Sequence, residues 1–138
     1  MICLDASVVG MLIAPDEQSA GLLDQYETAR LAGESFIAPM LLPFEMVSVL
    51  RKKELRRLLS PPEMLAALQY YYALQIDLRD FDGLWERILA LCQTFGPALT
   101  AHDASYVALA EKFHTPLWTA DKELYRAVSP HLDLMVLV

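Results

Sequence analysis

The sequence is poor in the residues that bind zinc or form disulfides. It contains two cysteines, Cys3 and Cys92, and three histidines, with no CxxC motif and no Cys/His cluster. A zinc site is therefore not expected. Because both cysteines have apolar neighbours, we expect them to be reduced residues of the core.

Long hydrophobic runs are also missing. The longest apolar stretch, residues 36–44, contains two prolines and is too short to span a bilayer. No basic region precedes an apolar one at the start, so we expect no signal peptide, no contact with a membrane and a cytoplasmic location. The phosphate-binding glycine motifs and the G-x-S-x-G motif of serine hydrolases are absent as well.

Positive charge is scarce. The chain has 11 Lys and Arg against 18 Asp and Glu, which gives a formal net charge of −7. This balance argues against a protein that binds nucleic acid by bulk charge. Carboxylates that hold divalent cations count as negative until the metal binds, so a metal-dependent nuclease is still compatible with the charge.

Apolar residues are abundant and regularly spaced. They make up 55% of the 138 residues, enough for a real core, and no repeat or flexible linker divides the chain. We expect one domain over residues 1–138. Short apolar runs predict strands at residues 2–4, 35–38, 74–78, 116–119 and 134–138. Helical periodicity and capping signals predict helices at 7–12, 19–31, 43–57, 61–73, 84–95, 101–113 and 122–128.

This alternation predicts the α/β class, as a three-layer α/β/α domain with a mainly parallel central sheet of about five short strands. Phe44, Val47 and Leu50 are expected to mark the buried face of the third helix. The buried face of the fourth helix is expected to carry Leu65, Leu68, Tyr72 and Ala73.

Four acids stand where a predicted strand or loop meets the start of a helix, namely Asp5, Glu45, Asp103 and Asp121. Each is explained singly by helix capping or by the helix dipole. Ligands of parallel α/β sheets bind beyond the carboxyl ends of the strands, where the topology places Asp5 and Asp121, and all four acids converge if the other two junctions share this edge. Converging carboxylates repel one another, and a cation compensates them. Oxygen ligands without His or Cys indicate Mg²⁺ or Mn²⁺.

The acids lie in four short motifs, at residues 2–7 (ICLDAS), 43–45 (PFE), 100–111 (TAHDASYVALAE) and 116–121 (PLWTAD). In order and approximate spacing these motifs resemble the PIN-domain family, and most closely the VapC-type toxins of toxin–antitoxin pairs. The resemblance implies an endoribonuclease, dependent on Mg²⁺ or Mn²⁺, that hydrolyses RNA phosphodiester bonds with metal-activated water. It also implies a homodimer, and a small antitoxin protein as the partner in a VapBC-type pair.

The resemblance assigns roles to individual residues. The catalytic residues and metal ligands, direct or through water, would be Asp5, Glu45, Asp103 and Asp121. Ser7 and Thr119 would orient acids or waters around them. Local capping and turn hydrogen bonds are the alternative account of these two hydroxyls. His102 is given no catalytic role, because it fits an exposed position at the start of a helix.

Basic and aromatic clusters supply further candidates. Contacts with RNA phosphates are considered for Lys122, Arg126, Arg51 and Lys52. For the basic segment 51–57, a solvated helix end is the favoured explanation. Residues 70–72 are three successive tyrosines, which cannot all face one core on a helix. We expect at least one of them at the surface, where protein packing is favoured over base stacking.

Three other functions are alternatives to this one. One is a non-catalytic PIN-like binding or regulatory domain, which would not need all four acids. A second is an RNA-processing nuclease outside any toxin–antitoxin system, which would share the same site. A third, a phosphoacceptor receiver domain, is disfavoured because Asp5 stands alone after its strand and the last strand is not followed by Lys.

Overall fold

The computed structural model describes residues 1–17 and 19–138. Its centre is a five-stranded sheet in the order β3-β2-β1-β4-β5, with every neighbouring pair parallel. The strands are β1 (Ile2–Leu4), β2 (Phe36–Pro39), β3 (Asp77–Arg79), β4 (Leu117–Thr119) and β5 (Met135–Leu137). The helices are α1 (Ala6–Ile13), α2 (Ala20–Leu31), α3 (Leu42–Leu55), α4 (Pro61–Ala73), α5 (Leu84–Phe95), α6 (Ala101–Phe113) and α7 (Lys122–Val128), with a short 3₁₀ helix at Gly96–Ala98.

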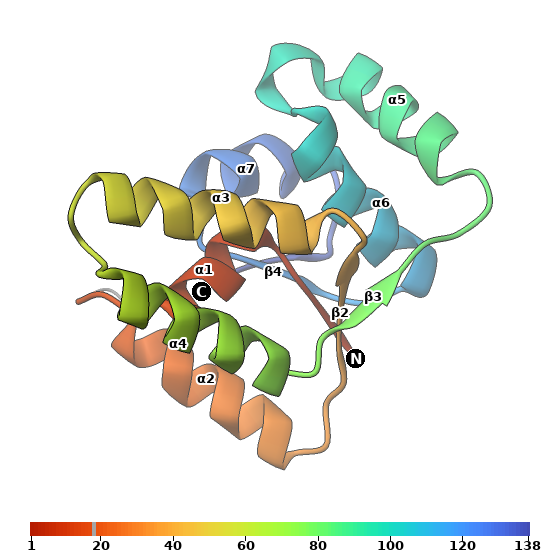
Figure 1. Ribbon diagram of the computed structural model, residues 1–138. Helices are drawn as coiled ribbons and strands as arrows, with labels where there is room; N and C mark the ends of the chain where they lie inside the picture. The colour runs from red at the N-terminus through yellow and green to blue at the C-terminus, as the bar shows by residue number, and fades with distance from the viewer. Residues whose placement is uncertain (18) are drawn as a thin grey trace.

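The helices form two layers, one on each face of the sheet. The chain moves from β1 to β2 to β3 in one direction, then crosses to β4 and β5 in the other, and right-handed crossovers put the two sets of helices on opposite faces. Helix α1 contacts α2, α3 and α4, whereas α6 contacts α5 and three strands. Figure 1 shows α2, α3 and α4 on one side and α5 with α6 on the other. The predicted three-layer α/β fold is confirmed.

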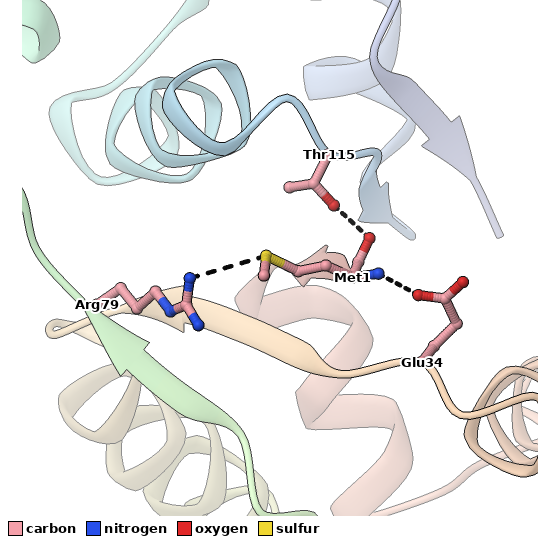
Figure 2. Close-up of polar contacts among 4 residues, drawn as sticks. All are labelled: Met1, Glu34, Arg79 and Thr115. Atoms are coloured by element: carbon pink, nitrogen blue, oxygen red, sulfur yellow. Dashed lines mark hydrogen bonds and ion pairs between the residues drawn. The ribbon is translucent and has the colours of Figure 1, made fainter.

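The strand starts are tied together around Met1. The Thr115 hydroxyl donates a hydrogen bond to the Met1 carbonyl, and the amino group of Met1 pairs with Glu34 (Figure 2). A guanidinium nitrogen of Arg79 lies 3.9 Å from the Met1 sulfur. Because Glu34 precedes β2 and Thr115 precedes β4, the contacts of these two residues with Met1 join the amino ends of β1, β2 and β4, whereas Arg79 is the last residue of β3. We call this region the amino edge.

Several predicted elements are confirmed to the residue, among them β1, α5, α6 and α7. The predicted face of the third helix was wrong in part. Phe44 and Val47 are 78% and 57% exposed, whereas Leu42, Met46 and Leu50 are buried. The helix begins at Leu42, and its four-residue spacing turns this stripe toward the core.

The face predicted for the fourth helix was also wrong in part. Leu65 and Tyr72 are exposed, and Ala67 is the buried residue of α4. An apolar residue on a helix can point to more than one side, and only the neighbouring α1 and α3 decide which side is covered. The third strand starts at Asp77, later than predicted. The reason is that Gln75 after α4 adopts a positive φ of 52°, so the chain is not yet extended there.

Burial agrees with the prediction for the cysteines. Cys3 is fully buried, Cys92 is half-buried, and both are unpaired. Along the part of the chain that the structure describes, no helix has the length and apolarity needed to cross a membrane.

Candidate active site

The four predicted acids follow the carboxyl ends of strands or begin helices. Asp5 directly follows β1, Glu45 lies in the first turn of α3, and Asp103 lies in the first turn of α6. Asp121 is the N-cap residue of α7. Electrostatic repulsion couples Asp103 to both Asp5 and Glu45. We call the region of these acids the carboxyl edge.

Asp5 is a buried carboxylate, with 4% of its surface exposed. Its Oδ1 accepts hydrogen bonds from the Val8 amide at 2.9 Å and from the Ser7 hydroxyl at 2.6 Å. The pKa of Asp5 is raised to about 6: burial is the largest cause and the charge of Asp103 adds to it, while the hydrogen bonds from Ser7, Thr119 and Val8 act in the opposite direction. Because the effect of burial exceeds that of the hydrogen bonds, the folded protein destabilises the ionised form of Asp5.

Glu45 is held by a residue that the sequence interpretation missed. The hydroxyl of Tyr106, a residue of α6 with 1% exposure, donates a hydrogen bond to Glu45 Oε2. Burial raises the pKa of Glu45, and so does Asp103, whereas the Tyr106 hydrogen bond and His102 lower it. Burial and Glu45 also raise the pKa of Tyr106, which therefore stays a neutral donor.

The helix periodicity contained the signal for this contact. Tyr106 follows Asp103 by three residues, so the two side chains share one face of α6. What the sequence could not supply is the partner, because Glu45 lies 61 positions away in the chain.

Asp121 fulfils the capping role considered for it, whereas the carboxylate of Asp103 accepts from the hydroxyl of Thr100 rather than from the Thr100 amide that a capping box uses. The Thr100 hydroxyl accepts from the Asp103 amide at 3.2 Å and donates to Asp103 Oδ2 at 2.6 Å. Oδ1 of the exposed Asp121 accepts from the amides of Glu123 and Leu124 at 2.8 and 3.0 Å. These hydrogen bonds use one carboxylate oxygen of each acid, so they do not conflict with a second role.

Two hydroxyls connect Asp5 with the loop that carries Asp121. Ser7 donates to Asp5 and accepts from the Ala120 amide at 2.9 Å. Thr119 forms a side-chain hydrogen bond with Asp5 and accepts from the Asp121 amide at 2.9 Å. These contacts put Asp5 and Asp121 in one hydrogen-bonded unit. The charge of Asp103 in addition acts directly on both Asp5 and Glu45.

The donor chemistry of this edge fits a hard divalent cation. Carboxylate and hydroxyl oxygens are the ligands that Mg²⁺ and Mn²⁺ prefer. Within residues 1–17 and 19–138, no group of three or more His, Cys, Asp or Glu is close enough to hold one ion together. Mg²⁺ usually keeps several waters and takes only one or two carboxylates directly, so the donor set still fits this ion.

The basic candidates occupy different surroundings. Lys122 and Arg126 are exposed on α7, next to Asp121. Lys52 is exposed on α3, where Arg51 pairs with Glu54 in the next turn. The neighbouring Lys53 donates to the carbonyl of Ala14 at 2.6 Å, at the end of α1. Lys53 of the basic segment therefore connects α3 to the end of α1 and has a structural role.

The chain is similar to known proteins over most of its length. The family model of the PIN domain matches residues 2–129. The VapC ribonuclease Mb0985 of Mycobacterium bovis is 35% identical over 124 residues, which cover 90% of this chain and 88% of that protein. Ribonuclease VapC9 of Mycobacterium tuberculosis gives the same values. Ribonuclease VapC3 of Pyrobaculum aerophilum is 32% identical over 127 residues, covering 89% of this chain and 91% of that protein.

Proposed function

This chain belongs to the PIN-domain family, and from that premise we propose that it is a divalent-metal-dependent endoribonuclease. It hydrolyses RNA phosphodiester bonds and acts as the toxin of a VapBC-type toxin–antitoxin pair. The names of its relatives support this function, because proteins called VapC ribonucleases match nearly the whole chain.

The observation that carries the proposal is that the acids of the carboxyl edge form no ion pair within the part of the chain that the structure describes. None of the ion pairs formed by the described residues includes Asp5, Glu45, Asp103 or Asp121. Asp5 is nevertheless buried, and the charge of Asp103 repels its carboxylate. Burying such charge without an opposite charge beside it costs stability, and a divalent cation offsets that cost.

The acids would hold Mg²⁺ or Mn²⁺ directly or through water. A bound divalent cation acidifies water and stabilises charge on a phosphoryl group. The chain itself orients the oxygens. Ser7 and Val8 fix the Asp5 carboxylate, and Tyr106 fixes that of Glu45. The α7 amides fix Asp121.

RNA is the proposed substrate, and basic side chains would contact its phosphates. Lys122 and Arg126 are the best placed, because they follow Asp121 on α7 and are exposed. Arg51 and Lys52 lie further along α3, beyond Glu45 by more than one helical turn. These two residues would attract the RNA backbone in a general way.

An antitoxin and a second copy of the chain are the proposed protein partners, in the cytoplasm. Exposed apolar side chains on α3 and α4 support such contacts, because Phe44, Val47 and Tyr72 are 78%, 57% and 74% exposed. Tyr70 and Tyr72 of the tyrosine run are exposed, in line with the sequence expectation that the run cannot be wholly buried. Apolar surface of this kind marks interaction sites in soluble proteins.

Cleavage of a structured RNA pool by the purified protein, freed of any partner, tests the function. Reactions contain Mg²⁺, Mn²⁺ or EDTA, and compare the wild type with Asp103→Asn. The matched control is Asp24→Asn, which removes an exposed acid of α2. We expect cleavage that requires metal, persists in Asp24→Asn and is lost in Asp103→Asn. A folded protein that cleaves nothing with either metal would instead support a non-catalytic binding domain.

A further inference from the structure

A pocket of about 390 Å³ opens at the carboxyl edge of the sheet, beside the acids. It lies between the segment that follows β2, the residue that follows β3, and helices α5 and α6. Its lining includes Met40, Leu41, Asp80, Trp85, Ile88 and His102. Pockets at this edge of a parallel sheet are where ligands of such folds bind.

The pocket adjoins the candidate active site, although none of the four acids lines it. His102 lines it and also acts electrostatically on Glu45. Leu41 lines it and is the N-cap residue of α3, whose first turn carries Glu45. His102 directly precedes Asp103. A ligand in the pocket therefore lies next to any group that is bound at these two acids.

The walls suit a flat aromatic ligand with a polar edge. Trp85 and Met40 are exposed by 75% and 56%, although both are large and apolar. Leu84 and Ile88 form a buried apolar floor from the same helix as Trp85. The imidazole of His102 and the carboxylate of Asp80 are the polar groups at the rim. Asp80 Oδ1 already accepts from the Phe81 amide at 2.7 Å, so its second oxygen is the one available to a ligand.

We infer that this pocket receives a single RNA base adjacent to the scissile phosphate, with Trp85 as its stacking partner. The inference rests on the proposed ribonuclease function and extends it to the choice of cleavage site. An RNA phosphate at Glu45 and Asp103 necessarily has a base within one nucleotide, and the pocket is the concave apolar surface that shares His102 with those acids. Unstacked bases on aromatic side chains are the usual means by which proteins recognise single-stranded RNA.

Trp85 fluorescence tests base binding directly. The chain has two tryptophans, so in the Trp118→Phe variant the signal comes from Trp85 alone. This variant is titrated without metal with the four ribonucleoside 5′-monophosphates, and with ribose 5-phosphate as the control that lacks a base. We expect saturable quenching by nucleotides, with at least one base preferred, and no response to ribose 5-phosphate. Equal, unsaturable responses to all five compounds, or no response, would overturn the inference.

Cleavage kinetics supply the second test. Trp85→Ala is compared with Leu89→Ala, which removes another exposed apolar side chain of α5 that does not line the pocket. We expect kcat/KM at the preferred RNA site to fall about tenfold in Trp85→Ala, with weaker discrimination between sites. Leu89→Ala should match the wild type, and Trp85→Phe should recover most of the loss.

The outcomes separate this inference from the function on which it rests. A wild type that cleaves no RNA contradicts the ribonuclease function, whereas the nucleotide titration still decides whether the pocket binds a base. Equal kinetics for Trp85→Ala and Leu89→Ala would overturn the inference and leave the ribonuclease function intact. If Trp85→Ala instead converts a dimer to monomers in sedimentation, the pocket is a subunit interface and the inference is wrong.

Discussion

The two edges of the sheet handle charge in opposite ways. At the amino edge, Glu34 is paired with the amino group of Met1, and the Thr115 hydroxyl satisfies a carbonyl (Figure 2). At the carboxyl edge, Asp5 is buried and Glu45 is half-buried, and neither forms an ion pair among the described residues. Hydrogen bonds from Ser7, Val8 and Tyr106 hold these carboxylates.

The difference separates a structural region from a functional one. The paired charges at the amino edge connect the ends of strands, and they need no added ion to neutralise them. At the carboxyl edge, burial and the charge of Asp103 raise the pKa of Asp5 and of Glu45, which is unfavourable for a structural cluster and typical of a site that receives a cation. Four experiments test this contrast, beginning with the largest expected effect.

Replacing Asp5 should abolish function without harming the fold. Asp5→Asn keeps an oxygen acceptor for the Val8 amide but removes the charge. We expect RNA cleavage to fall by about 100-fold or more. The far-UV circular dichroism spectrum should be unchanged. An unfolded Asp5→Asn protein would show that Asp5 is required mainly as a helix cap.

Divalent metal should stabilise the protein through the carboxyl edge alone. At about 100 times the dissociation constant, a bound ion adds about 2.7 kcal/mol to the free energy of unfolding. We expect Mg²⁺ or Mn²⁺ to raise the Tm of the wild type and of Glu34→Gln, an amino-edge control, by the same amount. Asp5→Asn should lose this increase. An equal metal effect in all three proteins would place the ion elsewhere.

The pH dependence of stability should reflect the raised pKa of Asp5. In the metal-free folded protein this pKa is about 6, above the ordinary value of 3.8. The folded state therefore binds the proton more tightly, and the stabilisation is complete below about pH 4 and is lost as the pH rises through 6. The shift sets an upper limit of about 3 kcal/mol. Urea unfolding at pH 4.5 and 7.5 should show the wild type losing stability relative to Asp5→Asn. Parallel pH profiles would mean that Asp5 titrates normally.

Two hydroxyl deletions should have different consequences at the two edges. Tyr106→Phe frees the Glu45 carboxylate, and we expect Mn²⁺ affinity to fall about tenfold, as for other residues that orient metal ligands. Thr115→Val leaves the Met1 carbonyl without its donor, and should cost about 1 kcal/mol of stability with normal metal affinity. Calorimetric titration and urea unfolding measure the two effects. Equal metal affinity in both variants would show that Tyr106 does not orient a metal ligand.

The fold was largely predictable because each layer left a local signal. Buried parallel strands are short apolar runs, and α6 has a capping threonine at Thr100 before its apolar helix. The faces of α3 and α4 were not predictable in the same way. Phe44 and Leu42 are equally apolar, and the approach of α1 to α3 decides which of them is buried.

One part of the candidate site was likewise predictable from the sequence, and the other part was not. The sequence alone determined the four acids, their order and their positions at helix starts, since these are local properties of Asp5, Glu45, Asp103 and Asp121. Only the tertiary structure decided that Asp103 repels Asp5 and Glu45, that Tyr106 holds Glu45, and that His102 borders a pocket. The physical reason is that hydrogen bonds and desolvation depend on atoms brought within a few ångströms by parallel strand pairing. The sequence spacing of those atoms, such as the 61 positions between Glu45 and Tyr106, carries no record of that approach.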